Sequence, residues 1–519
     1  MSTYTIPDNL FPYQKDDVNR LLRSDYSICN FSEMGTGKTP VSIAFSRLGK
    51  FKRTLIACPK TLRLEWARQI KEWTDIDPVV SRRGCYSRLD PLMEDLAKKE
   101  TNPFFIVNYE TFRTPRHMEV LNQVDFDLVI MDEAHRLRNH SRKMFKGIRE
   151  FLDNQPKAKS LPLTGSPIVN SPGDLHTMLR LVRPETYHAR NRQFFLDRYC
   201  VFSERGFLRC RDCGAYDYRL GSPVCQRCGS TNLKITVTQK PTGVRNLEEL
   251  REETEPFTIR RTKKECLPWL PDKCFRTVVL DMPKEQRKIY KQMEEELFVM
   301  LDSGEPLWAS SVLAQLTRLR QINLDPKIVG AEAPSAKVEF LEDLLESSDE
   351  KFVVYSTSEI LIRRLASTLP YKCITISGKT DADSRVPLSV EFNKDPSIKV
   401  CLATIGPESP GGEGLTLTGA SNCVFLDRWW TPITQSQAED RLHRIGQKDS
   451  VQVIVPVNSR SIDQSLDRIL HRKRAFSLEY FGEGDEQDIV KEVIDDLRAS
   501  RKLEKDEEDE KEDEDENGD

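Results

Sequence analysis

A glycine-rich stretch, residues 32–39 with the sequence SEMGTGKT, constrains this chain more than any other feature. It lies between a short uncharged run, residues 26–31, and a segment with the apolar spacing of a helix, residues 41–45. A strand, a glycine-rich turn and a helix start in this order form a phosphate cradle. Gly35 and Gly37 can adopt backbone conformations closed to other residues, which turns successive N–H groups toward an anion. The helix N-terminus adds unpaired donors and the positive end of its dipole.

We predict that Lys38 reaches the β- and γ-phosphates of a nucleotide and that the Thr39 hydroxyl binds Mg²⁺. Gly35, Thr36 and Gly37 complete the predicted cradle. The full pattern has glycine where Ser32 stands, so the match is partial. Taken alone, the motif leaves an ordinary glycine-containing turn open as an alternative.

Strand-like runs alternate with helical patterns through the first 170 residues, at residues 54–58, 104–107 and 126–131. This alternation predicts a parallel sheet covered on both faces, with ligands at the carboxyl ends of its strands. Asp132 and Glu133 follow the third run directly. We expect Asp132 to hold Mg²⁺ and Glu133 to polarise the water that attacks the γ-phosphate. Gln14, upstream of the cradle, is a candidate for the adenine edge because its amide both donates and accepts; a surface glutamine is the alternative.

The net charge of −4 hides an uneven distribution. Residues 506–519 hold eleven acidic residues and one lysine, a charge of −10, so the preceding 505 residues carry +6. A mildly basic body is compatible with a polyanionic partner. The acidic segment is expected to be disordered, and competition for a basic groove is the alternative. No apolar run approaches the roughly 18 residues of a membrane span, and the first ten residues lack signal-peptide features.

Four of the thirteen cysteines form two close pairs, Cys210/Cys213 and Cys225/Cys228, each followed by glycine and separated by eleven residues. Four thiolates at this spacing predict a closed, structural zinc site. A redox pair would need only one dithiol. Scattered cysteines elsewhere fit small buried residues in a reducing compartment.

A second α/β unit is predicted from strand-like runs at residues 352–355, 373–376, 400–403, 423–426 and 451–457. It has no phosphate loop of its own, and residues 330–335 form the expected hinge before it. Arg441 and Arg444 lie three residues apart, which predicts that they share one face of a helix and neutralise charge on the transferring phosphoryl group. Two surface arginines are the alternative.

These motifs resemble those of superfamily-two helicases, and their flanks resemble the Swi/Snf branch of DNA-translocating ATPases. The resemblance covers about residues 8 to 480. It is carried by Gln14, residues 35–39, DEAH at 132–135, LTGSP at 163–167, GGEGLTLT at 411–418 and QAEDRLHRIGQ at 437–447. In the fifth of these segments Thr416 stands where the family has asparagine, and Gly414 is assigned to nucleotide binding. A segment at residues 256–263 is basic enough to touch a nucleic-acid backbone, but a charged helical face is the preferred interpretation of its individual residues.

The resemblance implies an α/β fold with two RecA-like parallel-sheet lobes, helical protrusions and a small zinc-ribbon insertion. The expected domains are lobe 1 (1–200), the zinc ribbon (205–235), protrusions and linker (236–330), lobe 2 (331–485) and a C-terminal helix with the acidic tail (486–519). Its implied catalytic residues are Lys38, Asp132, Glu133, Arg441 and Arg444.

The implied activity is ATP hydrolysis with Mg²⁺, coupled to movement on double-stranded DNA through contacts to phosphates. A monomeric motor inside the cell is expected, cytoplasmic in a bacterium or phage and nuclear in a eukaryote. A strand-separating DNA or RNA helicase is the alternative, and a catalytically dead zinc-containing DNA-binding protein is a remote one.

Overall fold

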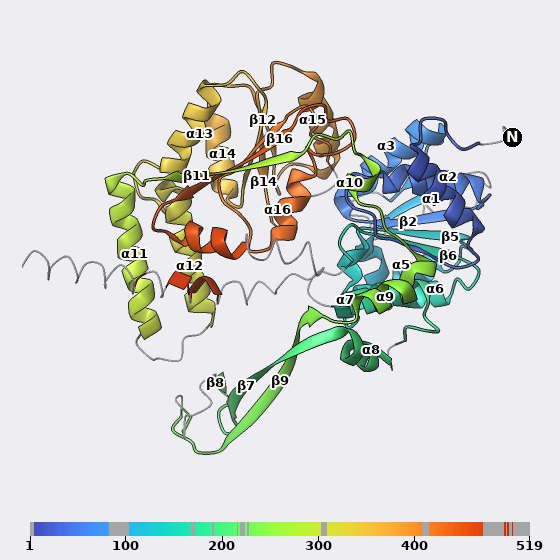
Figure 1. Ribbon diagram of the computed structural model, residues 1–519, viewed down its shortest axis with the longest axis horizontal. Coiled ribbons are helices and arrows are strands. Elements are labelled where there is room, and N and C mark those ends of the chain that lie inside the picture. The colour runs from blue at the N-terminus through green and yellow to red at the C-terminus, as the bar shows by residue number, and fades with distance from the viewer. Residues whose placement is uncertain are drawn as a thin grey trace, which may run out of the picture.

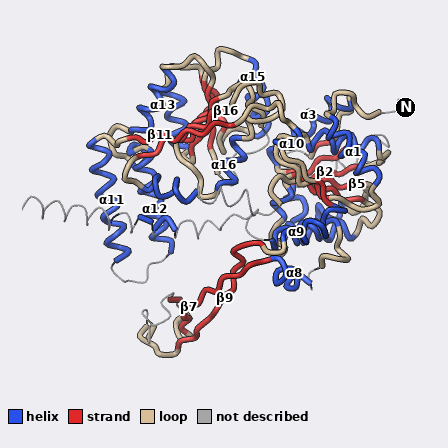
Figure 2. Tube along the Cα trace, viewed as in Figure 1, coloured by secondary structure: helices blue, strands red, loops and turns tan. Residues whose placement is uncertain are grey.

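The computed structural model contains two separate parallel sheets, each wrapped by helices, and a long β-arm that projects from the first lobe (Figure 1). Helices and strands alternate through both lobes in Figure 2. This confirms the predicted α/β class with two parallel-sheet lobes. The structure describes residues 5–81, 103–167, 172–188, 191–214, 216–217, 224–225, 228–302, 309–406, 415–470, 492–494, 496–497 and 501.

The first sheet has seven strands in the order β10-β1-β6-β5-β2-β4-β3, and all neighbouring pairs are parallel. Its strands are β1 (Cys29–Asn30), β2 (Thr54–Cys58), β3 (Val79–Val80), β4 (Phe104–Asn108), β5 (Leu128–Asp132), β6 (Lys159–Leu163) and β10 (Thr258–Ile259). Alternate residues of β2 point to opposite faces, so Leu55 and Ala57 join one apolar cluster while Ile56 and Cys58 join another. Both faces are therefore covered, as a parallel sheet requires.

Helices cover each face of this sheet. One face packs against α1 (Pro12–Arg23), α2 (Lys38–Leu48) and α3 (Arg63–Thr74). The other packs against α5 (Pro115–Leu121), α6 (Lys143–Asp153), α7 (Pro172–Val182), α8 (Arg192–Tyr199) and α9 (Leu247–Thr254). Short 3-10 turns connect them: η1 (Lys60–Leu62), η2 (Tyr109–Arg113), η3 (Ala134–Leu137) and η5 (Glu255–Phe257).

The second sheet has six strands in the order β11-β16-β15-β12-β14-β13, again with parallel neighbours. Its strands are β11 (Lys273–Leu280), β12 (Phe352–Ser356), β13 (Cys373–Ile376), β14 (Val400–Thr404), β15 (Asn422–Phe425) and β16 (Val451–Asn458). Its helices are α13 (Ala336–Glu346) and α14 (Glu359–Thr368) on one face, with α15 (Ala382–Lys394) and α16 (Pro432–Glu439) on the other.

Two longer helices, α11 (Lys284–Asp302) and α12 (Ala309–Leu324), pack against each other beside the second lobe and lead through η6 (Pro326–Val329) into α13. Tyr290 of α11 is fully buried, and its hydroxyl accepts a hydrogen bond from the Ile462 backbone N–H at 2.8 Å. Gln286 is also fully buried, and its amide donates to the Ile322 carbonyl at 3.0 Å. The Tyr290 contact attaches the helical pair to the segment after β16, and the Gln286 contact joins the two helices to each other.

The β-arm is an antiparallel ribbon of β7 (Cys200–Cys210) and β9 (Leu233–Val244), joined near its tip by β8 (Tyr216–Asp217). A bulge between Val201 and Phe202 shifts the register close to the lobe. The arm leaves the first lobe after α8 and returns before α9, so both of its ends are attached to the same lobe.

The chain crosses from the first sheet to the second between β10, ending at Ile259, and β11, beginning at Lys273. This crossing lies upstream of the hinge expected at residues 330–335. The reason is that β11 pairs along its whole length with β16, which places α11 and α12 after the crossing. A short helix, α10 (Lys263–Cys266), lies within the crossing segment. In the part of the chain that the structure describes, no helix is both long and apolar enough to cross a membrane.

The core beneath α6 offers a stability test. Phe151 is fully buried, and its ring meets those of Phe112 and Phe126 edge-on at centroid distances of 5.5 and 6.0 Å. We predict that Phe151→Ala destabilises the first lobe by about 3–5 kcal/mol, because it leaves a cavity and removes both ring contacts. Calorimetry should show a lower melting temperature for that lobe. Phe194→Ala, at a side chain that is 69% exposed, is the control and should leave the transition unchanged; equal melting of the two variants would contradict the core assignment.

Candidate active site

The phosphate loop connects β1 to α2, as the sequence predicts. Gly35 and Gly37 have φ angles of +83° and +84°, in the left-handed region that favours glycine. Gly37 is the residue before the first turn of α2, so the helix N-terminus points its free N–H groups into the loop. The loop therefore has the conformation and the helix start that an anion site requires.

Lys38 is the first residue of α2, and Thr39 is the second. The Lys38 ammonium donates to the carbonyl oxygens of Ser32 and Glu33, at 2.8 and 3.0 Å. Burial lowers the pKa of Lys38, while the carboxylates of Glu133 and Asp132 act in the opposite direction. In this geometry the loop closes over its own lysine, which two carbonyl groups of the loop hold in place.

Gln14 lies in the first turn of α1 and contacts the phosphate loop directly. Its Nε2 donates to the Thr36 carbonyl at 3.0 Å, and its Oε1 accepts from the Phe11 backbone N–H at 2.9 Å. The Tyr13 hydroxyl donates to the same Thr36 carbonyl at 2.8 Å. The structure thus brings Gln14 and the cradle together, with the glutamine amide buried against the loop.

Asp132 lies at the carboxyl end of β5, the position expected for a ligand-binding acid in a parallel sheet. Its Oδ2 accepts a hydrogen bond from the Trp66 indole at 2.8 Å, and its backbone carbonyl accepts one from the Tyr109 hydroxyl at 2.6 Å. Burial raises the pKa of Asp132 to about 6, and the neighbouring charge of Glu133 adds to that rise. Trp66 of α3 thus orients the carboxyl group of Asp132, while Tyr109 of η2 holds the backbone of the same residue.

Glu133 has a φ of +51°, an uncommon left-handed conformation for a residue with a side chain. Its Oε2 lies 3.3 Å from His135 Nδ1, and that nitrogen lies 3.1 Å from the Thr164 hydroxyl. Burial alone would raise the pKa of the Glu133 carboxyl group, but the hydrogen bond from His135 and the cations Lys38 and Arg441 lower it to about 2. The acidic pair therefore has two different environments, and its second member is linked through His135 to the loop after β6.

The arginines of the second lobe do not lie on a helix, which corrects the sequence-based prediction. Helix α16 ends at Glu439, and Arg441 and Arg444 follow in consecutive turns. The physical reason is tertiary: the Arg441 carbonyl accepts the Leu417 backbone N–H at 2.9 Å instead of an N–H further along a helix. We call residues 440–444 the arginine turn.

The arginine turn meets the phosphate loop across the cleft. A Cβ added to Gly35 would lie 3.1 Å from the Cβ of Arg444, so the two backbones are in close contact. Arg441 is 6% exposed; burial lowers its pKa, while the nearby Glu133 carboxylate opposes this effect. Burial also lowers the pKa of Arg444, to about 10. The structure thus brings Lys38, the acidic pair and Arg441 together between the lobes, and it packs the backbone of Arg444 against Gly35 of the phosphate loop.

Gly414 lies outside the described residues, because residues 407–414 are not among them. The described part of the same motif contacts the arginine turn, because the Leu415 carbonyl accepts from Arg444 Nη1 at 3.3 Å. The Thr416 carbonyl accepts a hydrogen bond from the Asn393 amide at 2.8 Å. This segment therefore binds Arg444 through the Leu415 carbonyl and Arg441 through the Leu417 backbone N–H.

The four cysteines of the two pairs converge at the tip of the β-arm. All four Sγ atoms lie within 4.8 Å of one another, with 3.6 Å between Cys210 and Cys228 and between Cys213 and Cys225. Tetrahedral zinc with bonds of about 2.3 Å separates its thiolates by about 3.8 Å, so the donor set fits that metal. Gly214 and Gly229 both have a φ of +73°, which forms the tight turn after each pair.

Sequence reasoning missed several residues of the cleft. Trp66 binds Asp132, and no motif of the sequence marks that tryptophan. Within the basic segment at residues 256–263, Arg261 binds Asp17 at 2.7 Å and Lys263 is buried between the lobes. The contact of Lys263 could not be predicted, because its partner, the His443 carbonyl, lies 180 residues away in the sequence.

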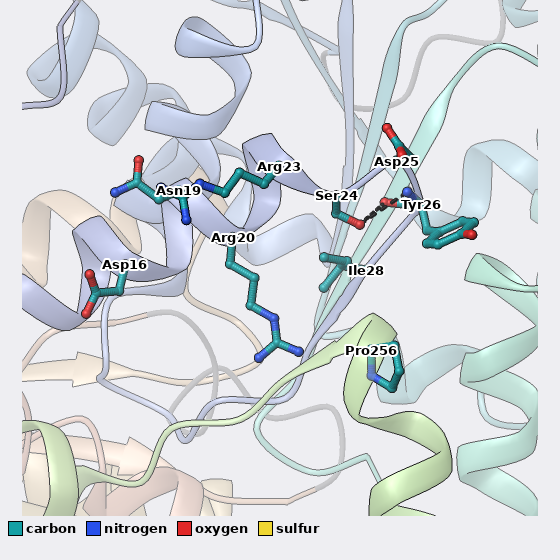
Figure 3. Close-up of a pocket in the computed structure, with 9 residues that line it drawn as sticks. All are labelled: Asp16, Asn19, Arg20, Arg23, Ser24, Asp25, Tyr26, Ile28 and Pro256. Carbon is teal, nitrogen blue, oxygen red and sulfur yellow. Dashed lines mark hydrogen bonds between the residues drawn. The ribbon is translucent and has the colours of Figure 1, made fainter.

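A surface pocket of about 550 Å³ lies apart from this cleft, at the far end of α1 (Figure 3). Arg20 and Arg23 line it from the helix, and Tyr26 and Pro256 lie on its other side. Arg20 is 3.0 Å from Glu255, and the guanidinium of Arg183 lies 4.3 Å from the Tyr26 ring. The pocket holds none of the residues predicted to bind nucleotide.

Comparison with known proteins extends the resemblance from these motifs to most of the chain. Residues 13–328 match the SNF2-related domain, and residues 336–446 match the helicase conserved C-terminal domain. The chain is 26% identical to the DNA annealing helicase and endonuclease ZRANB3 of Bos taurus over 90% of this chain and 40% of that protein. It is 22% identical to the uncharacterized ATP-dependent helicase MG018 of Mycoplasma genitalium over 96% of this chain and 44% of that protein.

A solved structure, the Sulfolobus solfataricus SWI2/SNF2 ATPase core in complex with dsDNA, is 23% identical and covers 96% of this chain and 98% of that chain, with a TM-score of 0.39. The chain spans about two fifths of the length of the curated relatives that it matches. The family model covers well over half of its residues, and the chain belongs to the SNF2-related family of ATPases.

Proposed function

We propose that this chain is an ATP hydrolase that is stimulated by double-stranded DNA and moves along it without separating the strands. One observation carries the proposal: a phosphate loop and an acidic pair from one lobe lie against the arginine turn of the other, with Arg441 near Glu133 and Arg444 packed on Gly35. Because neither lobe holds all of these groups, hydrolysis would require both to be close. Closure tied to the nucleotide state is the standard basis for stepwise motion of two linked domains.

The roles follow from the positions of the side chains. Lys38 would exchange its two carbonyl partners for phosphate oxygens of ATP, and the N–H groups at the start of α2 would bind the same anion. Glu133, kept ionised by its neighbours, would orient and polarise the attacking water. Mg²⁺ held by Thr39 and Asp132 would neutralise charge on the phosphates. Arg441, the arginine that faces Glu133, would stabilise charge on the transferring phosphoryl group, with Arg444 beside it.

We assign the domains as the sequence predicts them: lobe 1 (1–200), a zinc ribbon (205–235), protrusions and linker (236–330), lobe 2 (331–485) and a C-terminal segment (486–519). Both β10 and β11 then fall within the range of the linker. The strand β10 forms one edge of the first sheet, and β11 forms one edge of the second. A linker that adds a strand to each sheet would transmit the motion of one lobe to the other.

DNA is the proposed polymer because two of the relatives are described as helicases, one of them a DNA annealing helicase. The mildly basic body of the chain suits contacts to phosphates, which are indifferent to sequence and sensitive to salt. We place the chain inside the cell, where ATP, Mg²⁺ and DNA occur together.

The stimulation profile tests this function. We predict that duplex DNA raises the ATPase rate more than single-stranded DNA or RNA, and that the duplex concentration for half-maximal stimulation rises with salt. A strand-displacement assay on a forked substrate should show no unwinding. Unwinding together with preference for single strands would instead favour a helicase, and no hydrolysis under any condition would favour a non-catalytic DNA-binding protein.

Two substitutions separate binding from chemistry. We predict that Glu133→Gln still binds a fluorescent ATP analogue while its turnover falls by about 10²–10⁴-fold, because the base is lost and the fold is kept. Lys38→Ala should weaken nucleotide binding and abolish turnover. Lys157→Ala, at an exposed lysine between α6 and β6, is the control and should match the wild type. Unchanged turnover of Glu133→Gln would contradict the role given to that residue.

We propose that the four-cysteine cluster binds one structural zinc ion. A small module with little apolar core needs such a bond to fold, so zinc would supply folding energy to the tip of the arm. The nearby Asn232 amide donates to Asp212 at 2.9 Å, which ties the two cysteine turns together next to the cluster.

Metal analysis tests the zinc site. We predict about one zinc ion per chain in the wild type and its loss in Cys210→Ser, since three thiolates bind the ion far more weakly. Cys274→Ser, at an exposed cysteine on β11, should keep the full metal content. A metal-free chain whose arm resists proteolysis as well as the zinc-loaded one does would refute the assignment.

A further inference from the structure

One lysine joins the two halves of the cleft. Lys263 begins α10, in the segment that crosses from the first sheet to the second. Its backbone N–H donates to Glu33 Oε2 in the phosphate loop at 2.9 Å. Its ammonium donates to the His443 carbonyl at 2.8 Å and lies 2.8 Å from Asp440 Oδ1. The residue thus binds the phosphate loop with its backbone and the arginine turn with its side chain.

Its partners are the neighbours of the two arginines. Asp440 directly precedes Arg441, and His443 directly precedes Arg444. A fixed Asp440 side chain and a fixed His443 carbonyl therefore set where both guanidinium groups leave the backbone. The Lys263 side chain is 11% exposed, so these contacts form in a site largely shielded from water, where they are stronger than on the surface.

A second lysine binds the same acid from the other side. Lys273, the first residue of β11, lies 2.7 Å from Asp440 and 2.9 Å from Glu439. Burial would raise the pKa of Asp440, but the two lysines outweigh it and hold the pKa below its usual range. Lys273 belongs to the second sheet and so anchors the turn within its own lobe, whereas Lys263 anchors it to the phosphate loop of the first lobe.

The Lys263 side chain also packs between the phosphate loop and the arginine turn. A Cβ added to Gly35 would lie 3.3 Å from Lys263 Cε and 3.1 Å from Arg444 Cβ. The lysine stem, the phosphate loop and the arginine turn therefore touch at one point. A shift of the stem would change the distance between the arginines and the phosphates directly.

We propose that Lys263 is a positioning residue, which sets the arginine turn against the phosphate loop and so makes hydrolysis depend on closure of the lobes. This inference rests on the proposed ATPase function. It assigns to the residue a role distinct from backbone contact with DNA, because the side chain is buried between the two lobes.

Removal of the ammonium group should leave the fold intact. Asp440 keeps Lys273 as a partner, so no buried carboxylate is left without a cation. Methionine retains most of the lysine stem in the contact with Gly35 and Arg444. Lys263→Met therefore removes the cross-cleft hydrogen bond and ion pair without emptying the space.

The experiment compares the full-length wild type with Lys263→Met, Lys263→Arg and the control Lys264→Met. Lys264 is the next residue of the same helix and is exposed. Three quantities are measured for each: kcat and KM for ATP with saturating duplex DNA, the affinity for fluorescently labelled ADP, and the affinity for ADP with aluminium fluoride, which mimics the transferring phosphoryl group.

For Lys263→Met we expect kcat to fall by about 10- to 100-fold, because small displacements of positioned groups have effects of this size. KM for ATP and the affinity for ADP should stay within about threefold, since the phosphate loop is unchanged. The affinity for ADP with aluminium fluoride should fall together with kcat. Lys263→Arg, which keeps the charge and a donor, should recover most of both, and Lys264→Met should match the wild type.

The outcomes are distinguishable. A wild type that does not hydrolyse ATP overturns the proposed function and this inference with it. A wild type that hydrolyses ATP, with Lys263→Met equal to it in kcat and in aluminium fluoride binding, overturns the inference alone. Equal loss of ADP binding and of melting temperature in Lys263→Met and Lys263→Arg would show a purely structural role and would also overturn it.

Discussion

The buried charges around the acidic pair come from both lobes, and the contact between the lobes depends on them. Lys38, Asp132 and Glu133 belong to the first lobe, and Arg441 and Asp440 belong to the second. A buried ion without a partner costs several kcal/mol, so the Glu133 carboxylate needs the cations around it. In this geometry Arg441 and Lys38 both stabilise it.

The two sides of the cleft are held in different ways. On the first lobe each acidic side chain has its own support: the Trp66 indole for Asp132, and His135 with Thr164 for Glu133. The left-handed backbone of Glu133 is maintained by this surrounding structure. On the second lobe the arginines follow a helix end in consecutive turns, supported by side chains from other segments. The acidic pair is thus held by side chains of its own lobe, whereas the arginine turn also depends on a contact with Lys263 in the segment that crosses between the lobes.

The sequence predicts the local parts of this site well. The phosphate loop, the strand before the acidic pair and the alternation of strands and helices each depend on neighbours within a few residues, and the structure contains them. The end of α16 before Arg441 could not be predicted, because the hydrogen bond from Leu417 that replaces the helical one joins separate segments. The same holds for the link between Lys263 and Asp440, whose partners are 177 positions apart by their residue numbers.

Gly35 and Gly37 are constrained both by the backbone conformation of the phosphate loop and by the side chains that pack against it. Both have positive φ angles, which the cradle alone would require. A Cβ on Gly37 would lie 2.2 Å from Gln14 Nε2, so that position is constrained from within its own lobe. A Cβ on Gly35 would instead meet Arg444 of the other lobe. Two glycines of one loop therefore serve different contacts, and the first of them allows the arginine turn to approach the phosphate loop closely.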